Sequence, residues 1–146
     1  MKKFIFIAIT TLLAISGFLY YFFPGNKALA EEDGRIIKIE SPADNPESAM
    51  VISSPELEID KQIIVIWLNL IKGKEINVIF DDPKTVIAAT SDPMGFTTDD
   101  SGGFSARYMP HIATASLRFI KSGTYSYTVT SQMNGPKSSS GKIIVH

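Results

Sequence analysis

GTYSYTVTSQMNGPKSSSGKIIV, residues Gly123–Val145, is the stretch of sequence that decides the fold. It predicts two strands, Tyr125–Ser131 and Lys142–Val145, because tyrosine, threonine, valine and isoleucine are enriched in strands. The Asn-Gly-Pro and triple-serine sequence between them is typical of a loop. The chain is therefore expected to end in a strand–loop–strand unit. Tyr125, two residues after Gly123, is expected to be a corner tyrosine whose hydroxyl bonds back to the backbone.

The rest of the chain after residue 30 repeats this pattern of short apolar runs between turn residues. We expect no helix of real length there. Ser91–Ile112 is rich in Asp, Gly, Ser and Thr, so it is expected to be a long irregular segment, either functional or mobile. The pattern predicts an all-β Greek-key sandwich of about seven or eight strands. The expected earlier strands are Arg35–Glu40, Ala49–Ile52, Glu56–Ile59, Ile63–Leu70, Glu75–Phe80, Thr85–Thr90 and Thr114–Ile120.

The first 30 residues are typical of an export segment. Lys2 and Lys3 precede an apolar run over residues 4–23, and Ala28-Leu29-Ala30 provides an A-x-A cleavage site. The run is also long enough to span a bilayer, so a retained membrane anchor is the alternative. Residues 31–146 are then one exported domain, in the periplasm or outside the cell, with residues 4–23 as its only membrane contact if uncleaved.

Charge and cysteine content exclude several classes of function. Residues 31–146 have 11 basic and 15 acidic side chains, a net charge of −4. An acidic domain of this kind has no electrostatic reason to bind nucleic acid. The chain contains no cysteine, which excludes disulfides, thiolate metal sites and a cysteine nucleophile.

Two segments together resemble the cupredoxin family, the β-sandwich proteins that hold blue copper. In Ser54–Asp82, the sequence VIWLN (65–69) resembles the family's apolar-x-aromatic-x-Asn strand ending, and INVIF (76–80) resembles its His-Asn-apolar-apolar-Phe strand. In Ser116–Val145, an apolar strand closed by Phe precedes GTYSYTV (123–129) and GKIIV (141–145), which resemble the family's ending. The resemblance covers about half of residues 31–146 and implies a cupredoxin-like sandwich.

The resemblance also implies where copper ligands would stand. The family's first histidine falls on Ile76, its cysteine on Val129, its second histidine on or near Gln132, and its axial methionine near Ser139. Blue copper needs two imidazoles, a thiolate and a weak axial thioether. We therefore expect no metal at these four positions. We also expect Ile76 and Val129 to be buried beside each other under the last loop.

Other residues offer a copper site outside the family positions. Met94, Met109, His111 and Met133 carry the thioether and imidazole groups that suit Cu(I). Met109 could equally fill a gap in the core, with His111 as a loop residue.

No catalytic constellation emerges. The acidic residues in loops, which lack the order of a calcium loop, are more simply turn residues that cap their own backbone. There is no Gly-x-Ser-x-Gly motif, and His111 is the only internal histidine that could act as a base. We therefore do not expect an enzyme.

Three aromatic residues lie within the long polar segment. Phe96, Phe104 and Tyr108 either fold back onto the sandwich or form an exposed surface for a partner.

The hypothesis that we favour is a cupredoxin-like domain without cofactor, which acts as a binding or accessory module for another protein of the cell envelope. One alternative is an extracytoplasmic copper protein that uses the methionines and His111. The other is an immunoglobulin-like adhesion or assembly domain.

Overall fold

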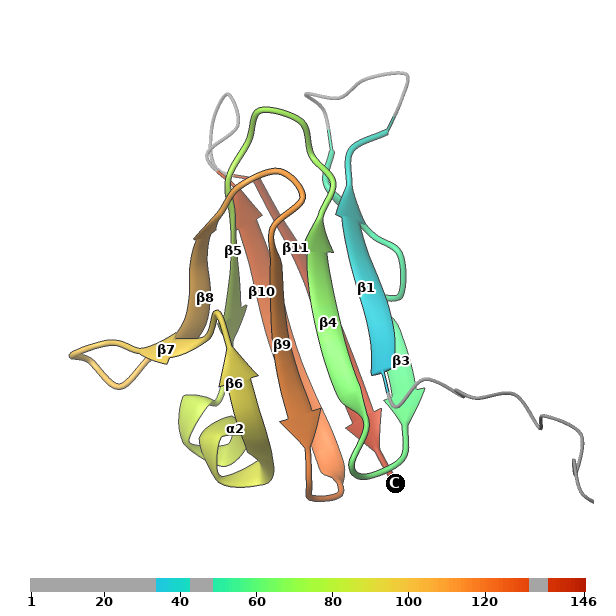
Figure 1. Cartoon of the computed structure of the whole chain (residues 1–146), viewed down its shortest axis with the longest axis vertical. Coiled ribbons are helices and arrows are strands. Elements are labelled where there is room, and N and C mark those ends of the chain that lie inside the picture. Colours follow the sequence, from blue (N-terminus) through green and yellow to red (C-terminus); the bar gives the residue numbers. More distant parts are fainter. Residues whose placement is uncertain (1–33, 43–48, 132–136) are drawn as a thin grey trace, which may run out of the picture. The chain divides into compact units, whose positions relative to one another are not determined.

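The computed structural model describes residues 34–42, 49–131 and 137–146. These residues form two β-sheets, one behind the other in Figure 1. The expected export segment, residues 1–30, lies outside the described residues. Within the described part of the chain, no helix is both long and apolar enough to cross a membrane.

The first sheet has five strands in the order β2-β1-β4-β9-β6. β1 runs parallel to β4, and the other neighbouring pairs are antiparallel. The bounds are β1 Gly34–Glu40, β2 Val51–Ile52, β4 Ile64–Asn69, β6 Thr90–Met94 and β9 Thr114–Phe119.

The second sheet has six strands in the order β3-β11-β10-β5-β8-β7. β3 runs parallel to β11, and the other pairs are antiparallel. Immunoglobulin sandwiches consist of two antiparallel sheets, so the parallel pairs in both sheets distinguish this fold from that alternative. The bounds are β3 Glu56–Ile59, β5 Ile76–Phe80, β7 Thr97–Thr98, β8 Phe104–Met109, β10 Gly123–Ser131 and β11 Lys137–Val145.

The predicted all-β Greek-key sandwich is confirmed. The described residues contain eleven strands rather than seven or eight. The strands that were not predicted are β6, β7 and β8, which lie almost wholly in the segment expected to be irregular, and β7 has only two residues, too few to leave a pattern in the sequence.

Trp67 lies at the centre of the core and joins the two sheets. It projects from β4 and is fully buried. Its ring centroid lies 5.8 Å from that of Phe80 and 5.6 Å from that of Tyr127, which belong to the opposite sheet. Phe96 approaches to 5.3 Å. Each such edge-to-face pair stabilises the fold by about 0.5–1.5 kcal/mol beyond its burial.

Pro83–Ala89 forms helix α2, so the predicted strand at Thr85–Thr90 is wrong. Asp82 caps the helix: its carboxylate accepts hydrogen bonds from the Thr85 amide at 3.1 Å and the Thr85 hydroxyl at 2.6 Å. These hydrogen bonds hold the pKa of Asp82 below its usual range. Pro83 in the first turn completes an arrangement that favours helix initiation over a strand.

Ser91–Ile112 is not irregular, which corrects a second prediction. It contains most of β6 and all of β7 and β8. The register of β6 against β9 shifts between Ser91 and Met94, and that of β8 against β5 shifts at Ile76–Val78. Because these irregularities break the two-residue alternation, the segment shows no strand periodicity in the sequence.

The C-terminal hairpin is longer than predicted. β10 and β11 have nine residues each. Their pairing starts with Gly123 opposite Val145 and ends with Ser131 opposite Lys137. The serines Ser138–Ser140 therefore lie in a strand, because β10 supplies them with antiparallel partners, and their assignment to a loop is wrong. The hydroxyl of Tyr125 donates to the Lys121 carbonyl at 3.0 Å, which confirms the corner tyrosine.

Tyr127 and Gly141 face each other in this hairpin. A Cβ atom on Gly141 would lie 2.5 Å from Cζ of Tyr127, so the ring occupies the space that any side chain would need. Tyr127 is fully buried, and its hydroxyl has no hydrogen-bond partner among the described residues. Burial raises the pKa of Tyr127 to about 12. The nearby Trp67 indole opposes this rise in part, although its N–H and the Tyr127 hydroxyl are too poorly aligned to count as a hydrogen bond.

The Tyr127→Phe variant is expected to be as stable as the wild type, or more stable, at neutral pH, because it loses an unpaired buried hydroxyl and no hydrogen bond. In the wild type, the free energy of unfolding falls as pH rises from about 10 to about 12, because the unfolded tyrosine loses a proton that the folded one keeps. The variant should avoid about 2–3 kcal/mol of that loss. Urea unfolding followed by circular dichroism across this pH range measures it.

The control is Tyr125→Phe. It loses the hydrogen bond to Lys121, so it should be less stable at neutral pH while keeping the alkaline loss that belongs to Tyr127. An equal alkaline loss in wild type and Tyr127→Phe would contradict the assignment.

Candidate functional site

The two central positions implied by the cupredoxin resemblance lie in the core. Ile76 and Val129 are both fully buried. Ile76 is the strand partner of Ser131, and Val129 is the partner of Val78 on one side and Ser139 on the other. Ile76 and Val129 are therefore diagonal neighbours on the inner face of one sheet.

The other two positions differ. Ser139 is half-buried on β11, and Gln132 lies outside the described residues. Ile76 and Val129 have no donor atom, and the described residues contain no group of three or more His, Cys, Asp or Glu that could hold a metal.

The structure places the other copper candidates in different environments. Met109 is buried at the end of β8, opposite Ile76, whereas Met94 on β6 is 70% exposed and belongs to the other sheet. His111 is half-buried in the next loop, where its Nδ1 has no hydrogen-bond partner among the described residues. Met133 lies outside the described residues. The structure therefore does not bring the exposed Met94 together with Met109.

Phe96 and Phe104 are buried, so of the two alternatives they follow the first and fold back onto the sandwich, and they form no exposed partner surface. Their rings stack at 5.4 Å, and Phe96 also packs against Phe80 at 5.7 Å. The two rings fold back because β7 and β8 extend the second sheet over the core. Tyr108, in contrast, is 70% exposed, as a partner surface requires.

A β-bulge explains the exposure of Tyr108. Ile76 pairs with Met109 and Val78 with Ala106, so Asn77 on β5 faces two residues of β8, Arg107 and Tyr108. Tyr108 has a φ of 54°, and its amide donates to Oδ1 of Asn77 at 2.9 Å. Without the bulge, consecutive residues would point to opposite faces. With it, Arg107 and Tyr108 are both exposed while Met109 stays in the core.

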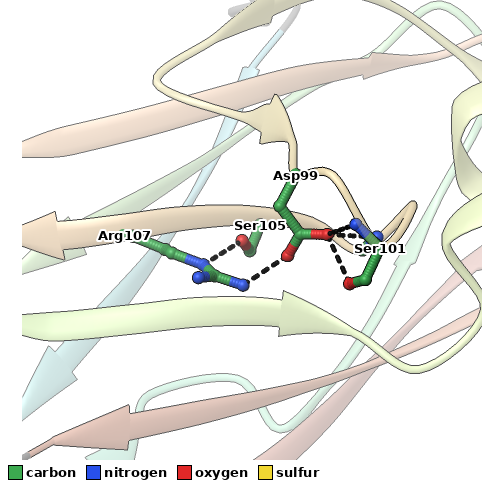
Figure 2. Close-up of polar contacts among 5 residues, drawn as sticks. Asp99, Ser101, Ser105 and Arg107 are labelled. Atoms are coloured by element: carbon green, nitrogen blue, oxygen red, sulfur yellow. Dashed lines mark hydrogen bonds and ion pairs between the residues drawn. The ribbon is translucent and has the colours of Figure 1, made fainter.

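Arg107 is held in place by its neighbours (Figure 2). Its Nη2 contacts Oδ2 of Asp99 at 2.5 Å, and its Nε donates to the Ser105 hydroxyl at 2.9 Å. The other oxygen of Asp99 accepts from the Ser101 hydroxyl and amide and from the Gly103 amide, at 2.6, 3.0 and 2.8 Å. These hydrogen bonds, led by that of the Ser101 hydroxyl, lower the pKa of Asp99. Asp99 is thus a turn residue that caps its own backbone, as expected.

Beside the bulge, the outer surface of the second sheet has a groove of about 530 Å³. Its lining includes two cations, a carboxylate, an amide and two apolar side chains: Lys74, Arg107, Glu75, Asn77, Ile79 and Tyr108. Sequence reasoning found Tyr108 but missed the groove. The available signal was Arg107-Tyr108, two consecutive residues that interrupt the alternation between Ala106 and Met109.

Asn69, at the end of β4, organises the backbone around this groove. Its buried side-chain amide donates to the carbonyls of Lys74 and Met109, at 2.9 and 2.8 Å, and its Oδ1 accepts from the Ile71 amide at 2.9 Å. Its main chain pairs with Ile112, whose amide donates to the Asn69 carbonyl at 2.7 Å. Ile112 has a φ of 63°, which is unfavourable for a β-branched residue, and is 70% exposed.

We call this region the bulge end of the sandwich. It is the end where β4, β8 and β10 finish and β5 begins (Figure 1). Its most exposed apolar side chains are Tyr108 and Ile112, and its groove carries Lys74 and Arg107.

Comparison with known proteins shows likeness at the level of fold. No protein-family model matches the chain, and the search of curated proteins gave no match. Solved structures of amicyanin mutants are similar. A methionine-to-glutamine mutant in its Cu(I) form shares 19% identity over 81% of this chain and 86% of that chain, with a TM-score of 0.45. A reduced tryptophan-to-tyrosine mutant shares 18% sequence identity over 81% of this chain and 87% of that chain, with a TM-score of 0.46. Nothing about copper or activity follows from this likeness.

Asn69→Ala is expected to lower the free energy of unfolding by about 3–5 kcal/mol, because it leaves one buried N–H and two carbonyls unpaired. Urea unfolding measures the loss. The matched control is Asn77→Ala, which removes a half-buried amide with hydrogen bonds to Thr130 and Tyr108 and should cost about 1 kcal/mol. Equal losses in the two variants would contradict the role given to Asn69.

Tyr108→Gly is expected to be more stable than Tyr108→Ala by about 1 kcal/mol, because only glycine adopts a positive φ without strain. In an ordinary strand the order is reversed, since glycine costs more entropy than alanine. Thermal unfolding of the two variants measures the difference. A more stable alanine variant would show that Tyr108 is unstrained.

Proposed function

We propose that this chain is an exported cupredoxin-like module that works without a blue copper centre and binds another protein of the cell envelope through its bulge end. The observation that carries the proposal is the pair Ile76 and Val129. Both are fully buried aliphatic side chains at the positions where the cupredoxin resemblance places copper ligands. A trigonal copper site needs imidazole and thiolate donors there, and the space is filled by packed core instead.

The exposed side chains at the bulge end support a binding role. Tyr108 and Ile112 are large, apolar and 70% exposed, and both lie at positive φ. Such backbone conformations cost about 1–3 kcal/mol each and are concentrated at functional sites. The chain thus accepts strain at two positions that present apolar side chains to solvent. Recognition of another protein explains both features.

A binding role is favoured over catalysis by the surroundings of His111. A histidine base needs a partner on its second nitrogen to orient the ring. Nδ1 of His111 has no hydrogen-bond partner in the described part of the chain.

Export is supported by the N-terminal sequence. Lys2 and Lys3, the apolar residues 4–23 and the small-residue site at Ala28-Leu29-Ala30 follow the order of a secretory signal. The absence of cysteine is compatible with an oxidising compartment, because no free thiol is exposed to it.

Copper analysis tests this function. We expect the purified full-length chain, loaded with Cu(I) and dialysed against a chelator, to retain far less than one copper per chain. Mass spectrometric metal analysis measures this. The matched variant combines Met109→Leu, a volume-conserving change in the core, with His111→Ala, and should behave like the wild type. Stoichiometric copper in the wild type that disappears in this variant would overturn the proposal in favour of a Met/His copper protein.

A further inference from the structure

The lining of the groove at the bulge end contains two cations: Arg107, which is paired with Asp99, and Lys74, which has no charged partner among the described residues. Within the described residues, the ammonium groups of Lys72 and Lys74 make no ion pair or hydrogen bond. Lys74 lines the groove directly. Its neighbour Glu75 places one carboxylate at the same groove, so two cations and one anion line it.

Arg107 adds a cation that is already oriented. Nε bonds to Ser105 and Nη2 to Asp99, so these two bonds fix the guanidinium plane, while Nη1 has no partner among the described residues. A fixed guanidinium loses little side-chain entropy when it binds a carboxylate, and such charge-assisted hydrogen bonds are stronger than neutral ones.

Tyr108 and Ile79 supply the apolar part of the same groove. The ring of Tyr108 is 70% exposed, and Ile79 is half-buried on the outer face of β5. Tyrosine contributes strongly to protein interfaces because a large ring is ordered at small entropic cost.

Charged side chains lie at both ends of the domain. Residues 31–146 are acidic overall, with a net charge of −4. At the opposite end, where β3 and β5 finish, charges of both signs are exposed: Asp60, Asp81 and Asp82 with Lys61, Lys84 and Lys121. Docking of an acidic partner at the bulge end is therefore favoured by the cations of the groove itself and not by repulsion elsewhere.

We infer that this groove binds an acidic segment of a partner protein, with carboxylates bonded to Lys74 and Arg107 and an apolar side chain packed on Tyr108. This inference rests on the proposed function, because it names the chemistry of the partner that the bulge end recognises.

The test uses the full-length chain in a non-ionic detergent and a fluorescein-labelled peptide of alternating glutamate and leucine. Fluorescence anisotropy should show saturable binding that weakens between about 50 mM and about 500 mM salt. A peptide with lysine in place of glutamate should not bind. Lys74→Glu should weaken binding about fivefold or more.

Tyr108→Gly is the most informative variant, because it should weaken binding about tenfold or more without straining the backbone at its positive φ. The matched charge control is Lys121→Glu, in the exposed turn before β10 at the opposite end, which should bind as the wild type does.

Three results would overturn the inference. The first is that the wild type does not bind the peptide, and the second is that Lys74→Glu and Lys121→Glu lose equal peptide affinity. The third is that oligogalacturonate, an acidic sugar polymer, binds more tightly than the peptide and is weakened by the same substitutions. The copper measurement separates this inference from the proposed function. If the chain retains no copper and binds no acidic peptide, only the acidic ligand proposed for the groove is contradicted. If the chain retains copper, the proposal of a copper-free module is contradicted, whether or not the peptide binds.

Discussion

The buried amide of Asn69 is the interaction on which the bulge end depends. It satisfies an N–H and two carbonyls from the β4–β5 loop and the end of β8. Because the Met109 carbonyl is fixed in this way, Met109 stays in the core and the extra residue of the bulge is forced outward. Tyr108 is thus placed on the surface by the hydrogen bond that the next residue, Met109, accepts from Asn69 inside the protein.

The interior and the surface of the bulge end differ in character. The interior, with Ile76 and Val129, is as apolar and as buried as the rest of the core. The surface carries strained apolar residues and unpaired lysines, which contribute nothing to folding stability. A protein selected for stability alone would keep the apolar interior and would lack the strained apolar residues and unpaired lysines of the surface. The surface that we propose for recognition is thus built on a closed, fully packed core.

The sequence predicted the features that depend on local pattern. Tyr125 lies where the Gly-x-Tyr turn places it, because this turn does not depend on distant contacts. α2 was missed because Asp82-Pro83 was interpreted as the end of a strand, although Asp followed by Pro also begins a helix. The bulge and groove were missed for a different reason. Arg107 and Lys74 are far apart in sequence, and only the pairing of β5 with β8 brings them to one surface.

The position of β11 has a consequence for the timing of folding. The last strand of the chain lies between β3 and β10, parallel to one and antiparallel to the other. β3 therefore stays separate from the rest of the second sheet until β11 pairs with both β3 and β10, and these contacts join segments distant in sequence, which slows folding.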